Sequence, residues 1–192
     1  MAVYTDVSDE DLAHFLTGYD LGEATSFKGI AEGVSNSNFF LQTTGGRFIL
    51  TLYEARAPRE DLPFFISLMD HLAAHGLACP RPVRNRAGEA LGEIAGRPAA
   101  LVTFLDGVSV KRPGVGHCLE LGRALARLHL AGHGFGMARP NPFSVSGWRP
   151  LAEQAGARAE TVSPRLSARI AEELAVHEAQ WPQELPQGVI HA

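Results

Sequence analysis

Residues 25–43 of this 192-residue chain read TSFKGIAEGVSNSNFFLQT, and this stretch decides the fold. Runs of strand-forming residues at 25–30 and 38–43 flank a segment of small polar residues that favour turns. The stretch therefore predicts a hairpin of two antiparallel strands. A Gly-Gly pair at 45–46 marks the next tight turn, and the apolar residues of 47–54 predict a third strand. The chain thus begins as an antiparallel meander.

Helical spacing of apolar residues occurs on both sides of this meander. Ser8 precedes three acidic residues, which is typical of a helix N-terminus, and the apolar stripe of that short helix consists of Leu12, Phe15 and Leu16. Residues 61–75 predict a second helix, because their apolar side chains repeat at helical spacing.

The rest of the chain predicts two more strands and then helices. The strands are expected at 90–94 and 97–105, on either side of a tight turn. From Pro113 onward the pattern is helical, and a stretch rich in Pro and Gly, 132–150, is expected to separate two apolar stripes. The stripes consist of Cys118, Leu121, Leu125 and Leu128, and of Leu166, Ile170 and Leu174. Residues 188–192 predict a short buried strand.

This order of elements predicts an α+β protein with two lobes. Residues 1–105 would form a lobe built on a small antiparallel sheet, and residues 106–192 would begin a helical lobe. A ligand is expected in the crevice where the two lobes meet, since such junctions are frequent binding sites.

The composition limits the classes of partner. The 17 Lys and Arg residues and 21 Asp and Glu residues leave a formal charge of -4, which gives no reason to expect nucleic acid or an anionic membrane. The polar N-terminus lacks the apolar run of a signal peptide, and no stretch has the length of a membrane span. Cys79 and Cys118 stand alone, so both are expected to be buried thiols of a cytoplasmic protein.

Residues 32–38 are the first candidate site. Gly33 allows close backbone approach, and short hydroxyl and amide side chains follow it at Ser35, Asn36, Ser37 and Asn38. Backbone N–H groups beside such side chains are suited to phosphate oxygens. An ordinary polar hairpin turn is the alternative that these residues alone leave open.

Residues 101–107 are the second candidate site. A strand that leaves the sheet before Asp106 offers the backbone donor and acceptor that an adenine needs, although an edge strand that simply ends here fits the same residues.

Histidine pairs occur at His71 and His75 and at His129 and His133, with the spacing of one helix face. The pairs lie in different halves of the chain and lack the glutamate of zinc enzymes, so a metal site is not expected. We expect His129 to be half-buried and to make a structural hydrogen bond.

Taken together, these segments resemble the bacterial homoserine kinases, a branch of the aminoglycoside phosphotransferase and choline kinase superfamily, which has the protein-kinase-like fold. The resemblance extends over the whole chain and is carried by 27–40, 47–54 and 61–65, by Leu121-Gly122, Leu125-Ala126 and Leu128-His129, and by 189–192. It implies ATP-dependent phosphorylation of the L-homoserine hydroxyl to O-phosphohomoserine, a step of threonine biosynthesis, with ATP and Mg²⁺ as cofactors. ATP and L-homoserine are then the expected partners, and neither nucleic acid nor a membrane is among them.

The resemblance also implies a nucleotide site. The turn that contains Gly33, Ser35, Asn36, Ser37 and Asn38 would cover the ATP phosphates, and residues 103–105 (Thr103, Phe104 and Leu105) would bind the adenine. Asp70 would be the helix acid that usually pairs with a strand lysine, and Thr51 stands where that lysine is expected. Lys28 is a substitute cation for the phosphates or an exposed strand lysine, and both readings stay open.

The family's catalytic loop reads His-x-Asp, and in this resemblance His191 supports that loop while the catalytic Asp would follow Ala192. The magnesium ligands are expected beyond the same point, so no catalytic residue is expected within the chain and the chain as given is expected to be inactive. Two alternatives stay open: another small-molecule kinase of this superfamily, acting on choline, methylthioribose or an aminoglycoside, and a noncatalytic nucleotide-binding module.

Overall fold

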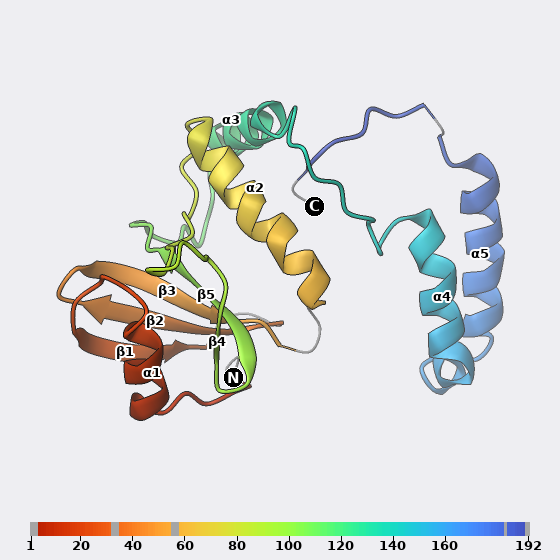
Figure 1. The fold of residues 1–192 in the computed structure, drawn as a ribbon. Coiled ribbons are helices and arrows are strands. Elements are labelled where there is room, and N and C mark those ends of the chain that lie inside the picture. Colours follow the sequence, from red (N-terminus) through yellow and green to blue (C-terminus); the bar gives the residue numbers. More distant parts are fainter. Residues whose placement is uncertain (1–3, 32–34, 55–57, 183, 191–192) are drawn as a thin grey trace. The chain divides into compact units, whose positions relative to one another are not determined.

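The computed structural model describes residues 4–31, 35–54, 58–182 and 184–190, which form two compact units (Figure 1). One unit comprises Met1–Met137 together with Gly188–Ala192, and the other comprises Ala138–Gln187. The contacts thus divide the chain after Met137, whereas the boundary between lobes at 105 and 106 concerns the lobes of a kinase-like protein and stays a prediction.

A five-stranded antiparallel sheet forms the framework of the first unit, with the strand order β1-β2-β3-β5-β4. The strands are β1 (Ala24–Ile30), β2 (Ser37–Thr43), β3 (Gly46–Leu52), β4 (Gly92–Ile94) and β5 (Arg97–Thr103). The predicted hairpin and meander are therefore confirmed. The predicted strand at 90–94 is shorter than expected, because Ala90 packs against a helix and not within the sheet.

The two faces of the sheet bury different elements. Cross-strand partners share a face, so the register places Phe39, Leu50 and Leu101 on one side, where they pack against α1 (Asp9–Leu16). Leu50 and Leu101 are fully buried there, and each such side chain stabilises the fold by roughly 1.5–3 kcal/mol relative to an exposed one. The helix begins at Ser8, whose hydroxyl accepts a hydrogen bond from the Asp11 N–H, as its sequence predicts.

The opposite side, which we call the α2 face, consists of two rows of paired residues. The first row is Lys28, Phe40, Ile49 and Val102, and the second is Ile30, Asn38, Thr51 and Ala100. The helix α2 (Leu62–Ala74) follows a 3-10 turn, η1 (Arg59–Asp61), and its Ile66 packs against Ala100. The second predicted helix is thus confirmed, and it covers part of this face.

The helix α3 (Val115–Ala131) meets the end of α2 through a small aromatic cluster. His71 Nε2 lies 2.7 Å from the Ala131 carbonyl oxygen, and the Phe135 ring contacts both His71 and Phe64, with centroids 5.2 and 5.4 Å away. The His71 and His75 rings themselves lie 4.2 Å apart. Both histidines therefore have packing roles.

Three predictions about the first unit are wrong. Cys118 and His129 are exposed, because both lie on α3, and none of the described side chains of this helix is buried. Cys79 is only half-buried. Burial still raises the pKa of the Cys79 thiol, which donates to the Met69 carbonyl. The described part of the expected terminal strand, 188–190, has no strand pairing, and Ile190 is exposed.

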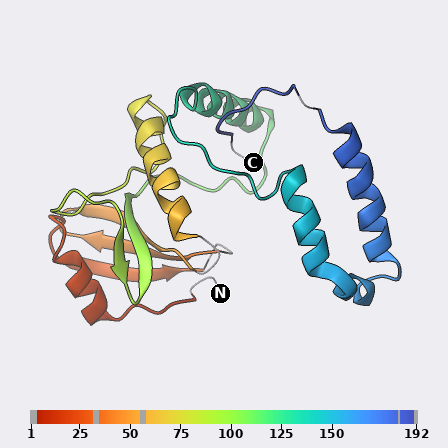
Figure 2. The ribbon, with the colours of Figure 1, turned by 45° about the vertical axis from the view of Figure 1, so that its right-hand side comes forward.

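The second unit is a pair of packed helices (Figure 2). Its elements are α4 (Val145–Ala155), the 3-10 segment η2 (Gly156–Thr161) and α5 (Leu166–Gln180). The stretch rich in Pro and Gly, 132–150, includes the beginning of α4, which starts at Val145 and contains Pro150. Contacts with α5 and the residue after it stabilise this helix: Arg149 forms a salt bridge with Glu178, and Trp148 packs against Trp181 with ring centroids 5.4 Å apart.

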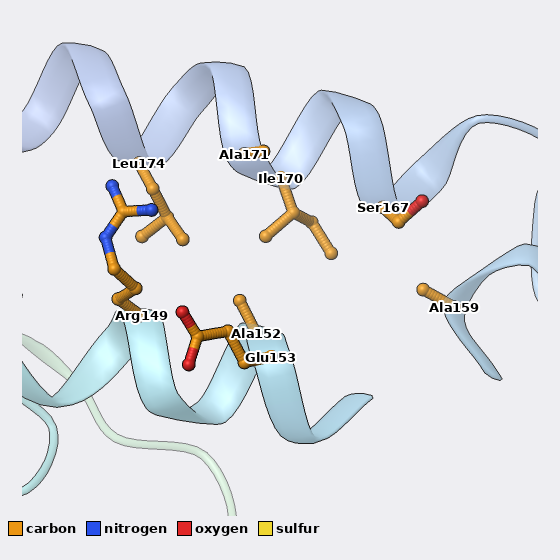
Figure 3. Close-up of a pocket in the computed structure, with 8 residues that line it drawn as sticks. All are labelled: Arg149, Ala152, Glu153, Ala159, Ser167, Ile170, Ala171 and Leu174. Carbon is orange, nitrogen blue, oxygen red and sulfur yellow. The ribbon is translucent and has the colours of Figure 1, made fainter. Parts of the chain in front are cut away.

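Figure 3 shows a small pocket between α4 and α5, with a volume of about 130 Å³. Ile170 and Leu174 project from α5 toward Ala152 of α4, so the lining is mainly apolar. A hollow of this size between two helices is a packing gap and holds no set of groups arranged for chemistry. Within the described ranges, no helix is long and apolar enough to cross a membrane.

Candidate functional site

Two of the predicted site residues are hydrogen-bonded neighbours at the centre of the α2 face. Asn38 of β2 pairs with Thr51 of β3, and the Thr51 hydroxyl donates to Asn38 Oδ1 at 2.8 Å. Because this bond occupies the amide oxygen, it orients the Asn38 NH₂ group away from Thr51. Two N–H donors are thereby presented beside the turn.

Lys28 lies on the same face, one row further along the sheet. It is exposed on β1 and pairs in register with Phe40, while Ile30 on the same strand pairs with Asn38. Residues two apart on a strand point to the same side, so the Lys28 ammonium and the Asn38 amide share this face. The arrangement places a cation and neutral donors together, which suits an anionic ligand.

The turn before β2 is only partly described. Gly33 lies outside the described residues, together with Glu32 and Val34. Ser35 is exposed, and Asn36 is half-buried with its Oδ1 atom buried and without a hydrogen-bond partner among the residues that the structure describes. The unpaired atom is an acceptor, so a phosphate oxygen cannot satisfy it, and only the NH₂ group of Asn36 could bind an anion.

Ser37 points to the other side of the sheet. Its side chain is fully buried, and its hydroxyl donates to Glu54 Oε1 at 2.6 Å. The structure therefore brings Asn38 to the α2 face and turns Ser37 away from it, while Asn36 lies just before β2.

The segment predicted to bind the adenine is held in place by hydrogen bonds of its own backbone. The Thr103 N–H donates to the Arg81 carbonyl at 2.9 Å, and the Phe104 N–H donates to the Arg47 carbonyl at 3.2 Å. Leu105 is 48% exposed and is the first of the three residues whose N–H has no backbone partner in the described chain. Only from Leu105 onward does this segment offer a free donor to a ligand.

Sequence reasoning missed the side chains that hold this segment. The Arg47 guanidinium lies over the Phe104 ring, 5.1 Å from its centroid, and forms a salt bridge with Asp106 at 2.9 Å. The Phe40 ring meets Phe104 edge-on at 5.4 Å. The pairing of the third and last strands could have suggested Arg47, because it places this residue opposite the end of β5.

Asp70 does not join the residues of the α2 face. Its carboxylate accepts a hydrogen bond from Arg84 Nη2 at 2.6 Å, and Arg84 Nη1 also donates to the Gly88 carbonyl. Asp70 is thus paired with a cation from the segment between α2 and β4, and Thr51 is bonded to Asn38.

The described residues contain no group of three or more His, Cys, Asp or Glu side chains that could hold a metal ion. The Mg²⁺ that the resemblance implies, with ligands expected after Ala192, stays a prediction, and His191 lies outside the described residues.

Comparisons with known proteins agree with this geometry. Curated homoserine kinases of Methylobacterium radiotolerans and Xanthobacter autotrophicus are 66% and 65% identical over all 192 residues, and the chain spans 60% of their length. A solved spectinomycin phosphotransferase, in complex with ADP and spectinomycin, matches 95% of the chain and 60% of its own, with a TM-score of 0.68 and 12% identity, which shows the fold. The family model of the phosphotransferase enzyme family matches residues 26–192. The chain, with its kinase-like antiparallel sheet, therefore belongs to the phosphotransferase enzyme family.

Proposed function

We propose that this protein is a homoserine kinase, which transfers the γ-phosphoryl group of ATP to the hydroxyl of L-homoserine and releases O-phosphohomoserine. The observation that carries the proposal is the 66% identity to a curated homoserine kinase, sustained over the whole of this chain. The exposed lysine and oriented amide on the α2 face support the nucleotide part, because ATP presents an anionic phosphate chain to its protein.

In this proposal the α2 face binds the nucleotide. Lys28 and the NH₂ group of Asn38 contact the phosphates. Asn36 would contribute its own NH₂ group, because its buried Oδ1 atom is an acceptor, as a phosphate oxygen is. Thr51 acts through Asn38 by holding its amide in one orientation. The rings of Phe40 and Phe104 line the apolar side, where the backbone of Leu105 is free to bind the base.

Residues 1–105 would then be the nucleotide-binding lobe, as the sequence predicts, and residues 106–192 would begin the lobe that receives the acceptor. Charge on the transferred phosphoryl group must be neutralised for reaction. Lys28 supplies one positive charge from this lobe, and it is the only lysine on the sheet.

Lys28→Ala tests the nucleotide part. The chain has two lysines, so Lys111→Ala, at a second exposed position, is a matched control for the loss of one positive charge. We expect Lys28→Ala to weaken ATP binding in a calorimetric titration by roughly tenfold, as for the loss of one charge-assisted hydrogen bond. Lys111→Ala should leave the affinity within about twofold. Equal affinities of the two variants would refute the role of Lys28.

An acceptor screen tests the substrate. ADP release is measured with L-homoserine, choline, methylthioribose and spectinomycin, on the protein at the length of its curated relatives. The proposal predicts turnover with L-homoserine above the other acceptors. Turnover with another acceptor would indicate a different small-molecule kinase, and ATP binding without any turnover would indicate a nucleotide-binding module.

A further inference from the structure

We propose that Glu54 is a positioning residue for the nucleotide site, which holds the end of the β1–β2 turn in place through the buried hydroxyl of Ser37. This inference rests on the proposed nucleotide-binding function of the α2 face. Glu54 lies behind that face, and among the described residues its carboxylate has polar contacts with Ser37, Thr5 and Arg97.

The Ser37 hydroxyl forms all the hydrogen bonds it can within the protein. It accepts hydrogen bonds from the backbone N–H groups of Tyr4 and Thr5, at 2.8 and 3.2 Å. A hydroxyl has two acceptor sites and one proton, so the proton must be donated to the third neighbour, Glu54 Oε1. Ser37 thus has no capacity left for a phosphate oxygen, although it lies in the turn that the sequence assigns to ATP.

Glu54 is the centre of this cluster. The residue is 8% exposed, and its second oxygen, Oε2, accepts from the Thr5 hydroxyl at 3.1 Å and forms a salt bridge with Arg97, whose Nε lies 3.3 Å away. The cluster therefore joins the N-terminal segment, the start of β2, the second residue after β3 and the start of β5. A buried carboxylate is retained at low cost only when its charge and its oxygens are paired in this way.

The cluster lies next to residues that the proposed phosphate site uses. Ser37 is the first residue of β2, and its neighbours Asn36 and Asn38 carry the amides that the proposed phosphate site uses. A strand residue that is anchored on one side determines where its two neighbours lie on the other side. Release of Ser37 would therefore displace both amides together.

A glutamine cannot replace Glu54 in this network. If the glutamine NH₂ group faced Ser37, it would need an acceptor there. Both acceptor sites of the Ser37 hydroxyl are already occupied by the N–H groups of Tyr4 and Thr5. If its NH₂ group faced the other way, it would meet the Arg97 Nε–H group. Each orientation leaves two donors facing each other in a buried site, which the charged carboxylate avoids.

The strand offers a matched control at its other end. Thr43 is 5% exposed, and its hydroxyl donates to the Leu21 carbonyl at 2.5 Å and accepts from the Gly45 N–H at 3.1 Å. Thr43→Ala and Ser37→Ala thus both remove a buried, hydrogen-bonded hydroxyl from β2, and only Ser37 adjoins the proposed phosphate site.

The experiment measures two quantities in the intact chain: amide hydrogen exchange of 35–43 without ligand, and the affinity for ATP. We expect Ser37→Ala and Glu54→Gln to increase exchange at 35–38 and to weaken ATP binding by roughly tenfold, as for the loss of one hydrogen bond to a charged group. Thr43→Ala should increase exchange only near its own end of the strand and leave the affinity within about twofold. Thr5→Val, at a half-buried residue, is a milder variant that removes one bond to Glu54 and should weaken binding in the same direction.

The outcomes separate this inference from the proposed function. If wild-type chain binds ATP and Ser37→Ala and Thr43→Ala weaken binding equally, Glu54 and Ser37 act only on stability and the inference is wrong. Unchanged exchange at 35–38 in Ser37→Ala and Glu54→Gln would also overturn it. Absence of ATP binding by wild-type chain, with the exchange difference present, would overturn the nucleotide site and the positioning role with it.

Discussion

Tyr19→Phe should stabilise the first unit, which is opposite to the usual effect of a substitution in a core. Tyr19 is 5% exposed and packs against Phe15, with ring centroids 5.1 Å apart. Its hydroxyl oxygen is buried and has no hydrogen-bond partner among the residues of 4–31, 35–54, 58–182 and 184–190. Phenylalanine keeps the ring and removes the unpaired group.

The magnitude follows from the cost of that unpaired group. A buried hydroxyl without a partner costs about 1–3 kcal/mol, so we expect the free energy of unfolding at pH 7 to rise by about 1 kcal/mol. The midpoint of thermal unfolding, followed by circular dichroism, should rise by roughly 2–4 °C for a chain of this size. Tyr19→Leu, which changes the ring itself, is the control and should lower the midpoint.

The same substitution has a predictable pH dependence. Burial, and the nearby charge of Glu89, raise the pKa of Tyr19 above its ordinary value of 10.0. The stability linked to the protonated form is therefore fully present below pH 10.0 and is lost as the pH rises through the folded-state pKa. Burial raises the pKa of Tyr53 as well, so Tyr19→Phe should reduce the alkaline loss without abolishing it. A lower midpoint for Tyr19→Phe at pH 7 would refute the reasoning, because it would mean that the hydroxyl makes a stabilising bond.

Two further predictions concern Asp70 and Gly22. Asp70→Asn should leave the ATP affinity within about twofold. It should lower the free energy of unfolding by less than about 1 kcal/mol, because the salt-bridge partner Arg84 is half-exposed. A large loss of affinity in a titration would instead place Asp70 in the nucleotide site. Gly22→Ala should lower stability by about 2 kcal/mol in denaturant unfolding, since Gly22 has a φ of +76° and a Cβ atom would lie 2.0 Å from Thr44 Oγ1. Gly76→Ala, with a φ of +78° and no atom within 4 Å of its Cβ, is the control for backbone strain alone, and an equal effect of both substitutions would contradict the predicted clash.

The part of the fold that depends on neighbouring residues was predictable. The alternation of 38–43 and the turn residues on both sides determine the β1–β2–β3 meander, and Ser8 with Asp11 determines the start of α1. The helix α4 was not predictable in this way, because Pro150 opposes helix formation locally and contacts with α5 stabilise it.

The candidate site was predictable only in part, for the same reason. The sequence by itself determined which segments form the strands and turns to which we assign the nucleotide, because strand period and turn composition are local properties. The same segments carry the resemblance to phosphotransferases. The tertiary structure alone decided that Asp70 pairs with Arg84, that Thr51 orients Asn38, and that Ser37 faces Glu54. These pairings join residues 13 to 17 positions apart through packing and strand register, and no local pattern specifies a partner at that distance.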